Sequence, residues 1–172
     1  MLNLTLPREE IMIRYFKKAI PLSIIATGIM ASASFADTFT LRVGSGHPSK
    51  PTAYVTNMEK VLVPNIKKRV AAETNHKVRI IEAYAGKIAK VHETLEAVEK
   101  GLLDIGSYCV CFETAKLLPW NFDYFVPFTT TNLETNWAVK HKILKQFPYL
   151  TKMLEDKYNQ KFIAMQGYDD YG

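Results

Sequence analysis

Residues 77–107, KVRIIEAYAGKIAKVHETLEAVEKGLLDIGS, have the pattern of a strand, a loop, a helix and a second strand. Aliphatic residues mark the two strands: Val78, Ile80 and Ile81 in the first, Leu103 and Ile105 in the second. Apolar residues recur between them at helical spacing: Val91, Leu95, Val98 and Leu102. Two short strands joined by an amphipathic helix predict a right-handed crossover, with the strands parallel in one sheet.

The loops that follow these two strands are the predicted ligand-binding edge, because open parallel sheets bind ligands beyond the carboxyl ends of their strands. The candidate residues there are Tyr84, Gly86, Lys87, Ser107 and Tyr108. A tyrosine at such a place offers a ring wall and a hydroxyl that can hydrogen-bond a bound anion. Residues 161–166 predict a further strand, which adds Tyr168 and Asp169 to the candidates.

Residues 39–43 alternate apolar and polar side chains and predict an earlier strand. It leads into a loop rich in glycine and proline, residues 44–51, a composition that invites comparison with a phosphate-binding loop. The Gly-Lys-Ser/Thr ending of such a loop is missing, and Pro48 and Pro51 remove two backbone N–H donors. The loop is therefore predicted to meet a smaller ligand than a nucleotide, with Gly46 and His47 as candidate contacts.

The remaining periodic segments predict helices. Residues 53–74 carry an apolar stripe that Pro64 interrupts, so we expect either a helix that ends near Val63 and a second helix, or a kink. A second stripe predicts a helix from Asn132 to Pro148, followed by one or two further turns. The apolar positions of these helices are Met58, Val61, Leu62, Ile66, Val70, Leu133, Trp137, Val139, Ile143, Leu144, Phe147, Leu150, Met153, Leu154 and Tyr158.

The N-terminus has the features of a cleavable secretory signal. A basic region, residues 14–18, precedes a largely apolar run, residues 19–30, and Ser34 and Ala36 provide the small side chains that a signal peptidase needs. The run is shorter than the ~20 residues of a membrane-spanning helix. We therefore predict that residues 1–36 are removed and that the protein is exported.

The charge of the chain argues against a nucleic-acid partner. The whole sequence has 22 Lys+Arg and 17 Asp+Glu; without residues 1–36, 18 basic and 15 acidic residues remain, a net charge of +3. These basic residues are scattered and form no stripe with stacking aromatic residues. A hydrophobic content of 48% and a charged content of 23% are ordinary for a globular chain with one core.

The two cysteines, Cys109 and Cys111, are separated by one residue. In a strand their side chains would point to the same face. The two residues would lie about 6.5–7 Å apart along the chain, at the edge of the range that a disulfide spans. A strained redox-active pair is one interpretation. The favoured interpretation is that the two cysteines are small buried residues of a strand, because cysteine is among the most buried residue types.

His92 and Glu96 lie one helical turn apart and match part of the zinc-protease pattern H-E-x-x-H, with Glu in the last position. A third ligand is not evident, and a solvated helix face is the favoured interpretation. The sequence has no G-x-S-x-G nucleophile elbow. The alternative to a binding protein is an exported enzyme that uses Cys109 and Cys111, or a metal held by His92 and Glu96.

Three motifs resemble the solute receptors of tripartite ATP-independent periplasmic (TRAP) transporters. They are Gly86-Lys87-Ile88-Ala89, Leu95-Glu96-Ala97-Val98 and Gly101-Leu102-Leu103-Asp104-Ile105-Gly106. In that family a "G-x-L-G" loop, a helix with "M-L-E-A-L" and a "G-x-L-D-M" motif recur at this spacing. The similarity extends to Leu41-Arg42-Val43-Gly44, His47-Pro48, Val126-Pro127-Phe128 and the segment into Gly167-Tyr168, and covers about residues 38–172.

The resemblance implies that residues 37–172 are an α/β, periplasmic-binding-protein-like lobe with a mainly parallel sheet flanked by helices, truncated before a second lobe is complete. It implies a receptor without enzymatic activity or cofactor, which captures a small organic acid and delivers it to a TRAP membrane permease. A receptor for an ABC-type importer would share the lobe architecture. The family's carboxylate-clamping arginine follows the segment that matches residues 162–166 and falls beyond Gly172. We therefore expect these 172 residues to bind an organic acid weakly or not at all.

Overall fold

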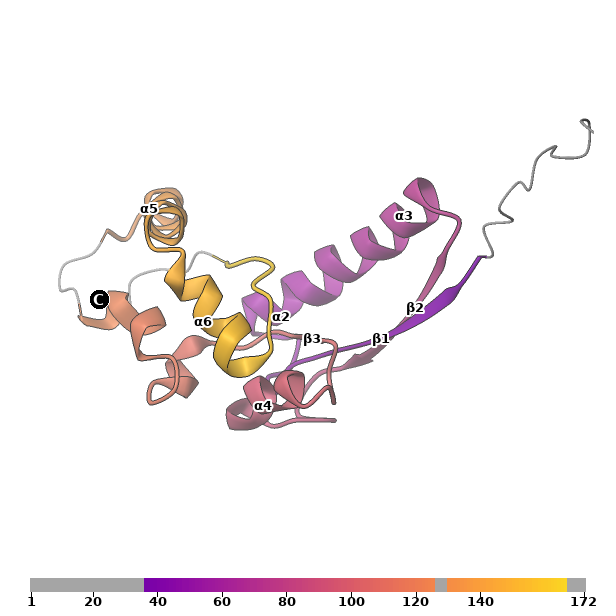
Figure 1. Cartoon of the computed structure of the whole chain (residues 1–172), viewed down its shortest axis with the longest axis horizontal. Helices are drawn as coiled ribbons and strands as arrows, with labels where there is room; N and C mark the ends of the chain where they lie inside the picture. Colours follow the sequence, from indigo (N-terminus) through magenta and orange to yellow (C-terminus); the bar gives the residue numbers. More distant parts are fainter. Residues whose placement is uncertain (1–35, 126–129, 167–172) are drawn as a thin grey trace, which may run out of the picture. The chain divides into compact units, whose positions relative to one another are not determined.

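The computed structural model describes residues 36–125 and 130–166 (Figure 1). The predicted signal, residues 1–36, lies outside these ranges except for Ala36, and so do the site candidates Tyr168 and Asp169. The strands are β1 (Thr38–Gly44), β2 (Lys77–Ala83) and β3 (Ile105–Gly106), and the helices are α2 (Ala53–Asn57), α3 (Val63–Glu73), α4 (Thr94–Glu99), α5 (Leu133–Gln146) and α6 (Tyr149–Tyr158). None of the described helices is long and apolar enough to cross a lipid bilayer.

The three strands form one parallel sheet in the order β2-β1-β3. Leu41 of β1 lies opposite Ile80 of β2, and Val43 of β1 lies opposite Ile105 of β3. The prediction that the segments around Ile80 and Ile105 are parallel in one sheet is therefore confirmed. β1 lies between them, so they are not adjacent strands.

This strand order creates a topological switch point between β1 and β3. The chain leaves β1 toward β2 on one side and then crosses to β3 on the other side. Right-handed crossovers in these two directions put their helices on opposite faces of the sheet, and Figure 1 shows α3 and α4 on opposite sides of the strands. Open α/β sheets bind ligands at such a point, so the loops after Gly44 and Gly106 are the first place to look.

The helical run after β1 continues through Pro64. α2 passes into a π-helical turn, Met58–Leu62, which passes into α3 at Val63. Proline has no N–H to donate and its ring excludes a carbonyl of the preceding turn, and a wider turn just before it accommodates both effects. Of the two alternatives, a helix that ends near Val63 is not observed; the run continues, with a local departure from α-helical geometry just before Pro64. Val61, a member of the predicted stripe, is 52% exposed.

α4 is shorter than predicted because a Schellman motif ends it. Gly101 has a φ of +69°, and its N–H donates to Val98 O (3.0 Å). The N–H of Leu102 donates to Ala97 O (2.7 Å), which completes the motif. Leu102 therefore lies beyond the helix and is 52% exposed, so its place in the predicted apolar stripe is wrong. The buried residues of α4 are Thr94, Leu95 and Ala97.

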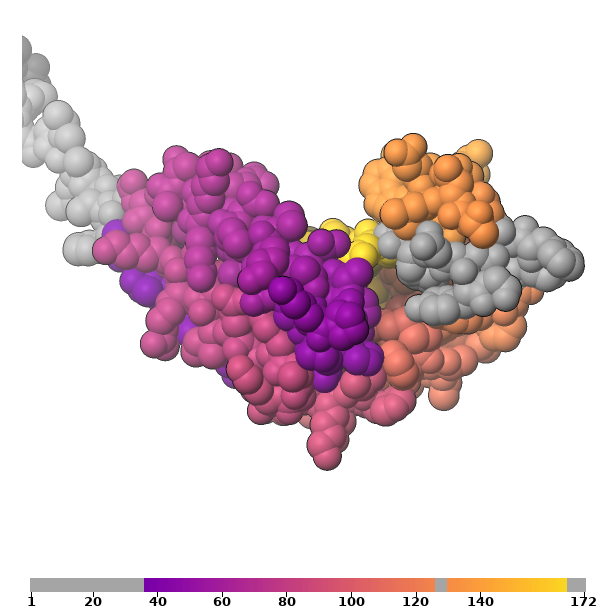
Figure 2. Space-filling model, turned by 180° about the vertical axis from the view of Figure 1, so that it is seen from behind, coloured from indigo at the N-terminus to yellow at the C-terminus, as the bar shows by residue number. Residues whose placement is uncertain are grey.

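α5 turns a polar face inward. Its buried residues are Asn136 and Lys140, whereas Trp137 and Val139 of the predicted stripe are each 48% exposed. Figure 2 shows the residues of α5, in orange, standing out at the surface. Lys140 Nζ forms an ion pair with Asp123 Oδ2 (2.6 Å) on this inward face. The predicted stripe is correct for Ile143 and Leu144, which pack against the core. It is wrong for the exposed residues of the stripe, Leu133, Trp137, Val139 and Phe147.

Asn132 caps α5 through its side-chain oxygen, which accepts a hydrogen bond from Thr135 N–H (2.8 Å). The predicted start of this helix is confirmed. Replacing Asn132 by Ala removes the acceptor, so we expect the free energy of unfolding to fall by about 1 kcal/mol. Urea denaturation followed by circular dichroism measures the change. Asn75→Ala, in an exposed turn, is the control and should cost less than about 0.5 kcal/mol; equal costs would contradict the cap.

The predicted strand at residues 161–166 is absent, because this segment has no regular secondary structure. Gln160, just before it, is buried, and its Nε2–H donates to Leu95 O (2.8 Å). Phe162 packs on Trp120 with ring centroids 5.3 Å apart. The segment is therefore held by side-chain contacts with helical elements, and its apolar pattern reflects this packing.

Three clusters of buried side chains form the core, and the smallest contains Ala89, Ala97 and Leu103. The first joins the sheet to the helical run after β1 and contains Val43, Met58 and Val63. The second joins α4, α6 and the segment after β3, and contains Leu95, Leu117, Trp120, Leu150 and Leu154. Trp120 Nε1–H donates to Leu150 O (3.1 Å), so the indole is satisfied within the cluster. This second cluster anchors the chain that leaves the β3 end of the sheet.

Candidate ligand-binding site

The loops that leave the three strands are hydrogen-bonded to one another at the carboxyl edge of the sheet. The four backbone bonds are Ser45 N–H to Ala83 O (3.2 Å), Gly86 N–H to Ser45 O (3.2 Å), Ala85 N–H to His47 O (2.9 Å) and Ser107 N–H to Gly44 O (3.0 Å). The loop after β1 is thus joined to the loop after β2, and the loop after β3 is joined to Gly44, the last residue of β1. The structure brings the predicted candidates Gly46, His47, Gly86 and Ser107 into one place.

Gly46 lies where the loop after β1 touches the turn before α4. A Cβ atom on Gly46 would stand 2.2 Å from Val91 N and 2.4 Å from Lys90 C. The N–H of Gly46 donates to Thr94 Oγ1 (3.2 Å), and the buried Thr94 hydroxyl donates to Lys90 O (3.0 Å). Gly46 therefore permits a close backbone approach, and the next residue, His47, carries the side chain at the edge.

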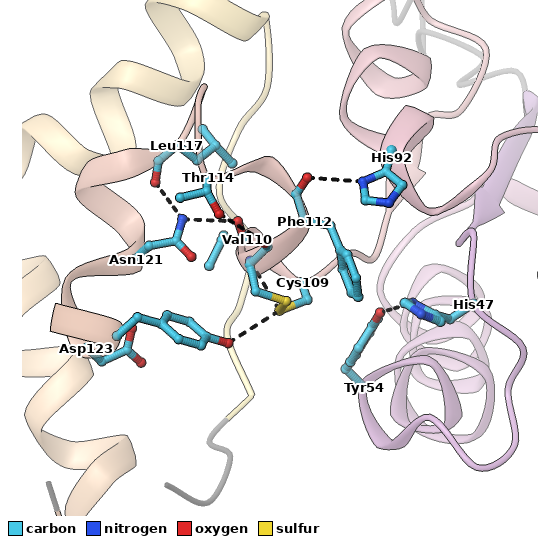
Figure 3. Close-up of a disulfide and its surroundings, with 12 residues drawn as sticks. His47, Tyr54, His92, Cys109, Val110, Phe112, Thr114, Leu117, Asn121 and Asp123 are labelled. Atoms are coloured by element: carbon cyan, nitrogen blue, oxygen red, sulfur yellow. Dashed lines mark hydrogen bonds between the residues drawn. A yellow bond between two sulfur atoms is a disulfide. The ribbon is translucent and has the colours of Figure 1, made fainter. Parts of the chain in front are cut away.

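His47 belongs to a group of rings that we call the histidine cluster, made of His47, Tyr54, His92 and Phe112 (Figure 3). Its Nδ1 lies 2.5 Å from Tyr54 Oη, and His92 Nδ1 lies 3.3 Å from Phe112 O. The Phe112 ring centroid is 5.2 Å from that of His47 and 5.3 Å from that of His92. Imidazole and phenol groups both donate and accept hydrogen bonds, so the cluster offers polar contacts beside an aromatic wall.

Two of the predicted site tyrosines have their hydroxyls engaged within the fold. Tyr84 Oη donates to Glu82 Oε2 (3.0 Å), and burial together with the neighbouring carboxylate of Glu82 raises the pKa of Tyr84 above its ordinary value. Tyr108 Oη donates to Gln160 Oε1 (3.0 Å), and burial followed by the charge of Glu113 raises the pKa of Tyr108. Both tyrosines stay neutral at any physiological pH.

The loop after β2 contains two consecutive residues in the left-handed region, Ala85 with a φ of 58° and Gly86 with a φ of 73°. For alanine this conformation costs roughly 1 kcal/mol. Both N–H groups donate to the loop after β1, which holds the turn in place. The next residue, Lys87, is exposed. The loop therefore presents a cationic side chain from a backbone turn of defined geometry.

Cys109 and Cys111 form a disulfide bond just after β3. They lie at the start of a 3-10 turn, Val110–Glu113, and both are partly exposed. The interpretation of two small buried strand residues is therefore wrong. β3 ends at Gly106, and the helical turn brings the two Cα atoms to 5.2 Å from each other, closer than an extended strand would.

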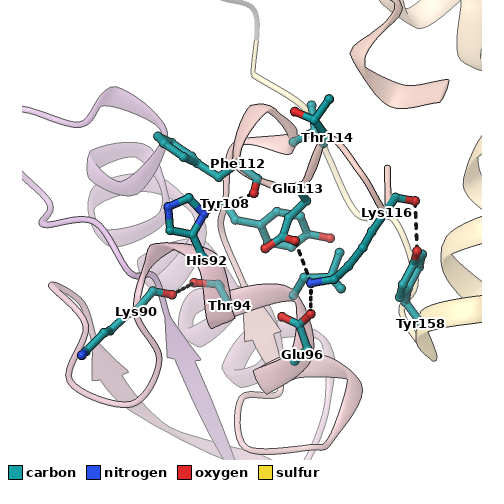
Figure 4. A network of polar contacts seen from close by, with 12 residues as sticks. Lys90, His92, Thr94, Glu96, Tyr108, Phe112, Glu113, Thr114, Lys116 and Tyr158 are labelled. Atoms are coloured by element: carbon teal, nitrogen blue, oxygen red, sulfur yellow. Dashed lines mark hydrogen bonds and ion pairs between the residues drawn. The ribbon is translucent and has the colours of Figure 1, made fainter. Parts of the chain in front are cut away.

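A polar network beside the histidine cluster ties α4 to the segment after β3 and to α6 (Figure 4). Lys116 Nζ binds Glu96 Oε1, and it binds Glu113 Oε2 at 3.1 Å. The Glu113 side chain is only 4% exposed. Hydrogen bonds to Glu96 and then to Glu113 raise the pKa of Lys116. Tyr158 Oη donates to Lys116 O (2.9 Å), which links α6 to the same network.

His92 and Glu96 have separate partners in the structure. His92 Nδ1 faces the carbonyl oxygen of Phe112, and Glu96 is bound to Lys116. Over residues 36–125 and 130–166, no group of three or more His, Cys, Asp or Glu side chains is arranged to hold a metal ion. Of the two arrangements considered for an enzyme, the disulfide is the one that the structure forms.

Two surface cavities lie away from the sheet edge. One, of about 240 Å³, lies at the ion pair of Asp123 and Lys140, and the other, of about 370 Å³, lies against α6 near Tyr149 and Met153. Neither is lined by the histidine cluster or by the strand-end loops. We place the candidate site at the strand-end loops because polar groups from several elements converge there, whereas the cavity against α6 is a shallow surface feature.

Tyr54 and Phe112 are members of the site that strand-end positions do not predict. Tyr54 follows His47 by seven residues, in the first turn of the helical run, and Phe112 directly follows Cys111. Both residues lie beyond the strand ends, in the helical turns that follow the loops after β1 and β3. The signal available in the sequence is an aromatic residue in each of these two turns.

Comparisons of this chain with protein-family models, with curated proteins and with solved structures give no match. The fold is α/β, with a three-stranded parallel sheet flanked by helices.

Proposed function

We propose that residues 37–172 form a periplasmic-binding-protein-like lobe of a TRAP-type solute receptor. In this proposal the exported protein captures a small organic acid and presents it to the membrane permease subunits of the transporter. The observation that carries the proposal is the hydrogen-bonded junction of three strand-end loops at one edge of a parallel sheet. Ligands of open α/β sheets bind at that edge, and the sequence resemblance supplies the ligand class and the transporter.

The polar groups at the junction suit a carboxylate ligand. His47 and Tyr54 form a hydrogen-bonded polar pair at this edge, and Lys87 adds an exposed positive charge on the neighbouring loop. Hydrogen bonds to a charged carboxylate are roughly twice as strong as those between neutral groups. Phe112 supplies an apolar wall for a short carbon chain. A small mono- or dicarboxylate therefore matches the junction better than a larger or cationic ligand.

We expect this chain to bind a small organic acid weakly. Binding sites for small molecules commonly bury 70–90% of the ligand surface. The junction is an open edge, and neither of the two cavities described above lies there. A dissociation constant of roughly millimolar order, about −4 kcal/mol, is the expected result.

The proposal is tested by titrating ¹⁵N-labelled protein with succinate, malate and 2-oxo acids while amide chemical shifts are recorded. We expect saturable shifts at Gly46, His47, Gly86, Ser107 and their neighbours, because these amides belong to the junction. Shifts that are absent for every acid, or that map to α5 and α6, would refute a carboxylate site at the strand-end loops.

Two histidine variants make this titration specific. His47→Ala removes a ring from the junction, and we expect the shifts to weaken at least about threefold at a fixed ligand concentration. His76→Ala is the matched control, because His76 lies just before β2, at the opposite end of the sheet, and its ring packs on Phe39. If both variants reduce the shifts equally, the ligand does not bind at His47.

A further inference from the structure

The disulfide between Cys109 and Cys111 closes one of the shortest loops that a disulfide can close, since the two residues are two positions apart. In the chain-entropy account, a disulfide stabilises the folded state more when it closes a longer loop. A bond across a single intervening residue therefore adds little to the stability of the fold. Its presence calls for a different explanation from that of a structural crosslink.

The turn that carries the disulfide is held by other contacts. Asn121, which is 1% exposed, donates through Nδ2 to Val110 O (3.0 Å), the residue between the two cysteines. Thr114 Oγ1 donates to Cys111 O (2.9 Å). The second core cluster lies directly beyond the turn and fixes Leu117. The sulfur–sulfur bond can therefore open and close while the backbone around it keeps its place.

We propose that Cys109–Cys111 is a redox-active disulfide that accepts two electrons from a dithiol. A thiolate of the dithiol attacks Cys111 Sγ, the bond between the two sulfurs breaks, and Cys109 leaves as a thiolate. The second thiolate of the dithiol then attacks the mixed disulfide and releases Cys111 as a thiolate. The dithiol becomes a disulfide, and its two protons end on Cys109 and Cys111. A more oxidising disulfide reverses the sequence.

The structure distinguishes the two sulfurs. Cys111 N–H lies 3.3 Å from Cys109 Sγ and donates to it, and the hydroxyl of Tyr124 lies 4.0 Å from the same sulfur (Figure 3). A hydrogen bond to the charged form of a thiol favours the thiolate, and the better-stabilised thiolate is the better leaving group. Cys109 is therefore the leaving sulfur, and Cys111 is the sulfur that forms the mixed disulfide.

The first test is the rate of reduction by dithiothreitol in native buffer and in concentrated urea, with iodoacetamide trapping and mass spectrometry. The chain has 2 cysteines, so each alkyl group reports one of this pair. We expect the native rate to be within tenfold of the rate in urea, with the far-ultraviolet circular dichroism unchanged by reduction. A native rate more than tenfold slower, or loss of the fold on reduction, would overturn the proposal.

The second test compares the alkylation of single variants at pH 6. Cys111→Ser keeps the backbone donor to Cys109, whereas Cys109→Ser leaves Cys111 without the donor that the structure gives to Cys109. The donor favours the thiolate of Cys109, and the larger thiolate fraction outweighs the accompanying fall in intrinsic nucleophilicity. We therefore expect Cys109 to react faster than Cys111. Equal rates, or a faster Cys111, would overturn the assignment of Cys109 as the leaving sulfur.

Discussion

Replacing Lys140 by Met should lower the free energy of unfolding by about 3–5 kcal/mol, because the substitution leaves the Asp123 carboxylate without its cation. Lys140 Nζ lies 2.6 Å from Asp123 Oδ2, and the two side chains are 4% and 14% exposed. Water can therefore hydrate the Asp123 carboxylate of the variant only in part. Urea denaturation followed by circular dichroism gives the change in free energy.

Two further variants test the origin of this loss. Burial lowers the pKa of Lys140 in spite of the hydrogen bond and the charge of Asp123, so desolvation outweighs the attraction within the pair. The double variant Lys140→Met with Asp123→Leu should therefore recover most of the lost stability. Lys152→Met breaks the exposed pair with Asp156 and should cost less than about 0.5 kcal/mol. A double variant as unstable as Lys140→Met would contradict the argument.

Replacing Gly46 by Ala should cost about 3 kcal/mol or more of folding stability, at the upper end of what overpacking costs. The added Cβ would stand 2.2 Å from Val91 N, and the neighbouring atoms are backbone atoms that cannot rotate away. The loop after β1 would separate from the turn before α4, and the hydrogen bond to Thr94 Oγ1 would be lost. Denaturation curves measure the cost, and the amide titration should show weaker shifts at His47.

Gly101→Ala is the matched control for this substitution. Gly101 has a φ of +69°, but a Cβ there would meet no atom within 4 Å. The substitution therefore carries only the cost of the left-handed conformation, about 1 kcal/mol. If Gly46→Ala costs no more than Gly101→Ala, the close approach at Gly46 does not constrain the loop.

The sequence predicts those elements whose pattern is local. β1 and β2 follow from short runs of alternating or β-branched residues, and the start of α5 follows from Asn132 before a periodic stripe. The parallel arrangement of Ile80 and Ile105 follows from the helix between them. The position of β1 between these strands depends on long-range pairing, which no local pattern records.

The errors arise where tertiary contacts override the pattern. The apolar residues of 161–166 suggest a strand, but Phe162 packs on Trp120 and no strand forms. Leu102 fits the helical stripe, but Gly101 has already ended the helix. On α5, the buried ion pair of Lys140 fixes which face is turned inward. Hydrophobic periodicity assigns charged residues to the exposed face of a helix, so it cannot predict a charged residue that is buried with its partner.

Part of the candidate site could be predicted from the sequence. Strand ends locate Gly46, His47, Gly86 and Ser107, and the structure brings these four together. Tyr108 is predicted for the same reason, yet its hydroxyl is hydrogen-bonded to Gln160, which is 52 residues away in sequence. The direction in which a side chain leaves a strand end depends on such distant partners. For this reason, the grouping of His47 with Tyr54, His92 and Phe112 could not be predicted.

The central position of β1 has a consequence for biosynthesis. β1 emerges first from the ribosome, but its pairing partner β2 begins at Lys77, and its other edge is covered only when Ile105 arrives. At about 5–20 residues per second, the roughly sixty residues between β1 and β3 take about 3–12 s to be translated. An uncovered strand edge pairs readily with strands of other chains. Until residue 105 has been synthesised, the edge of the central strand that the shortest strand covers therefore has no native partner.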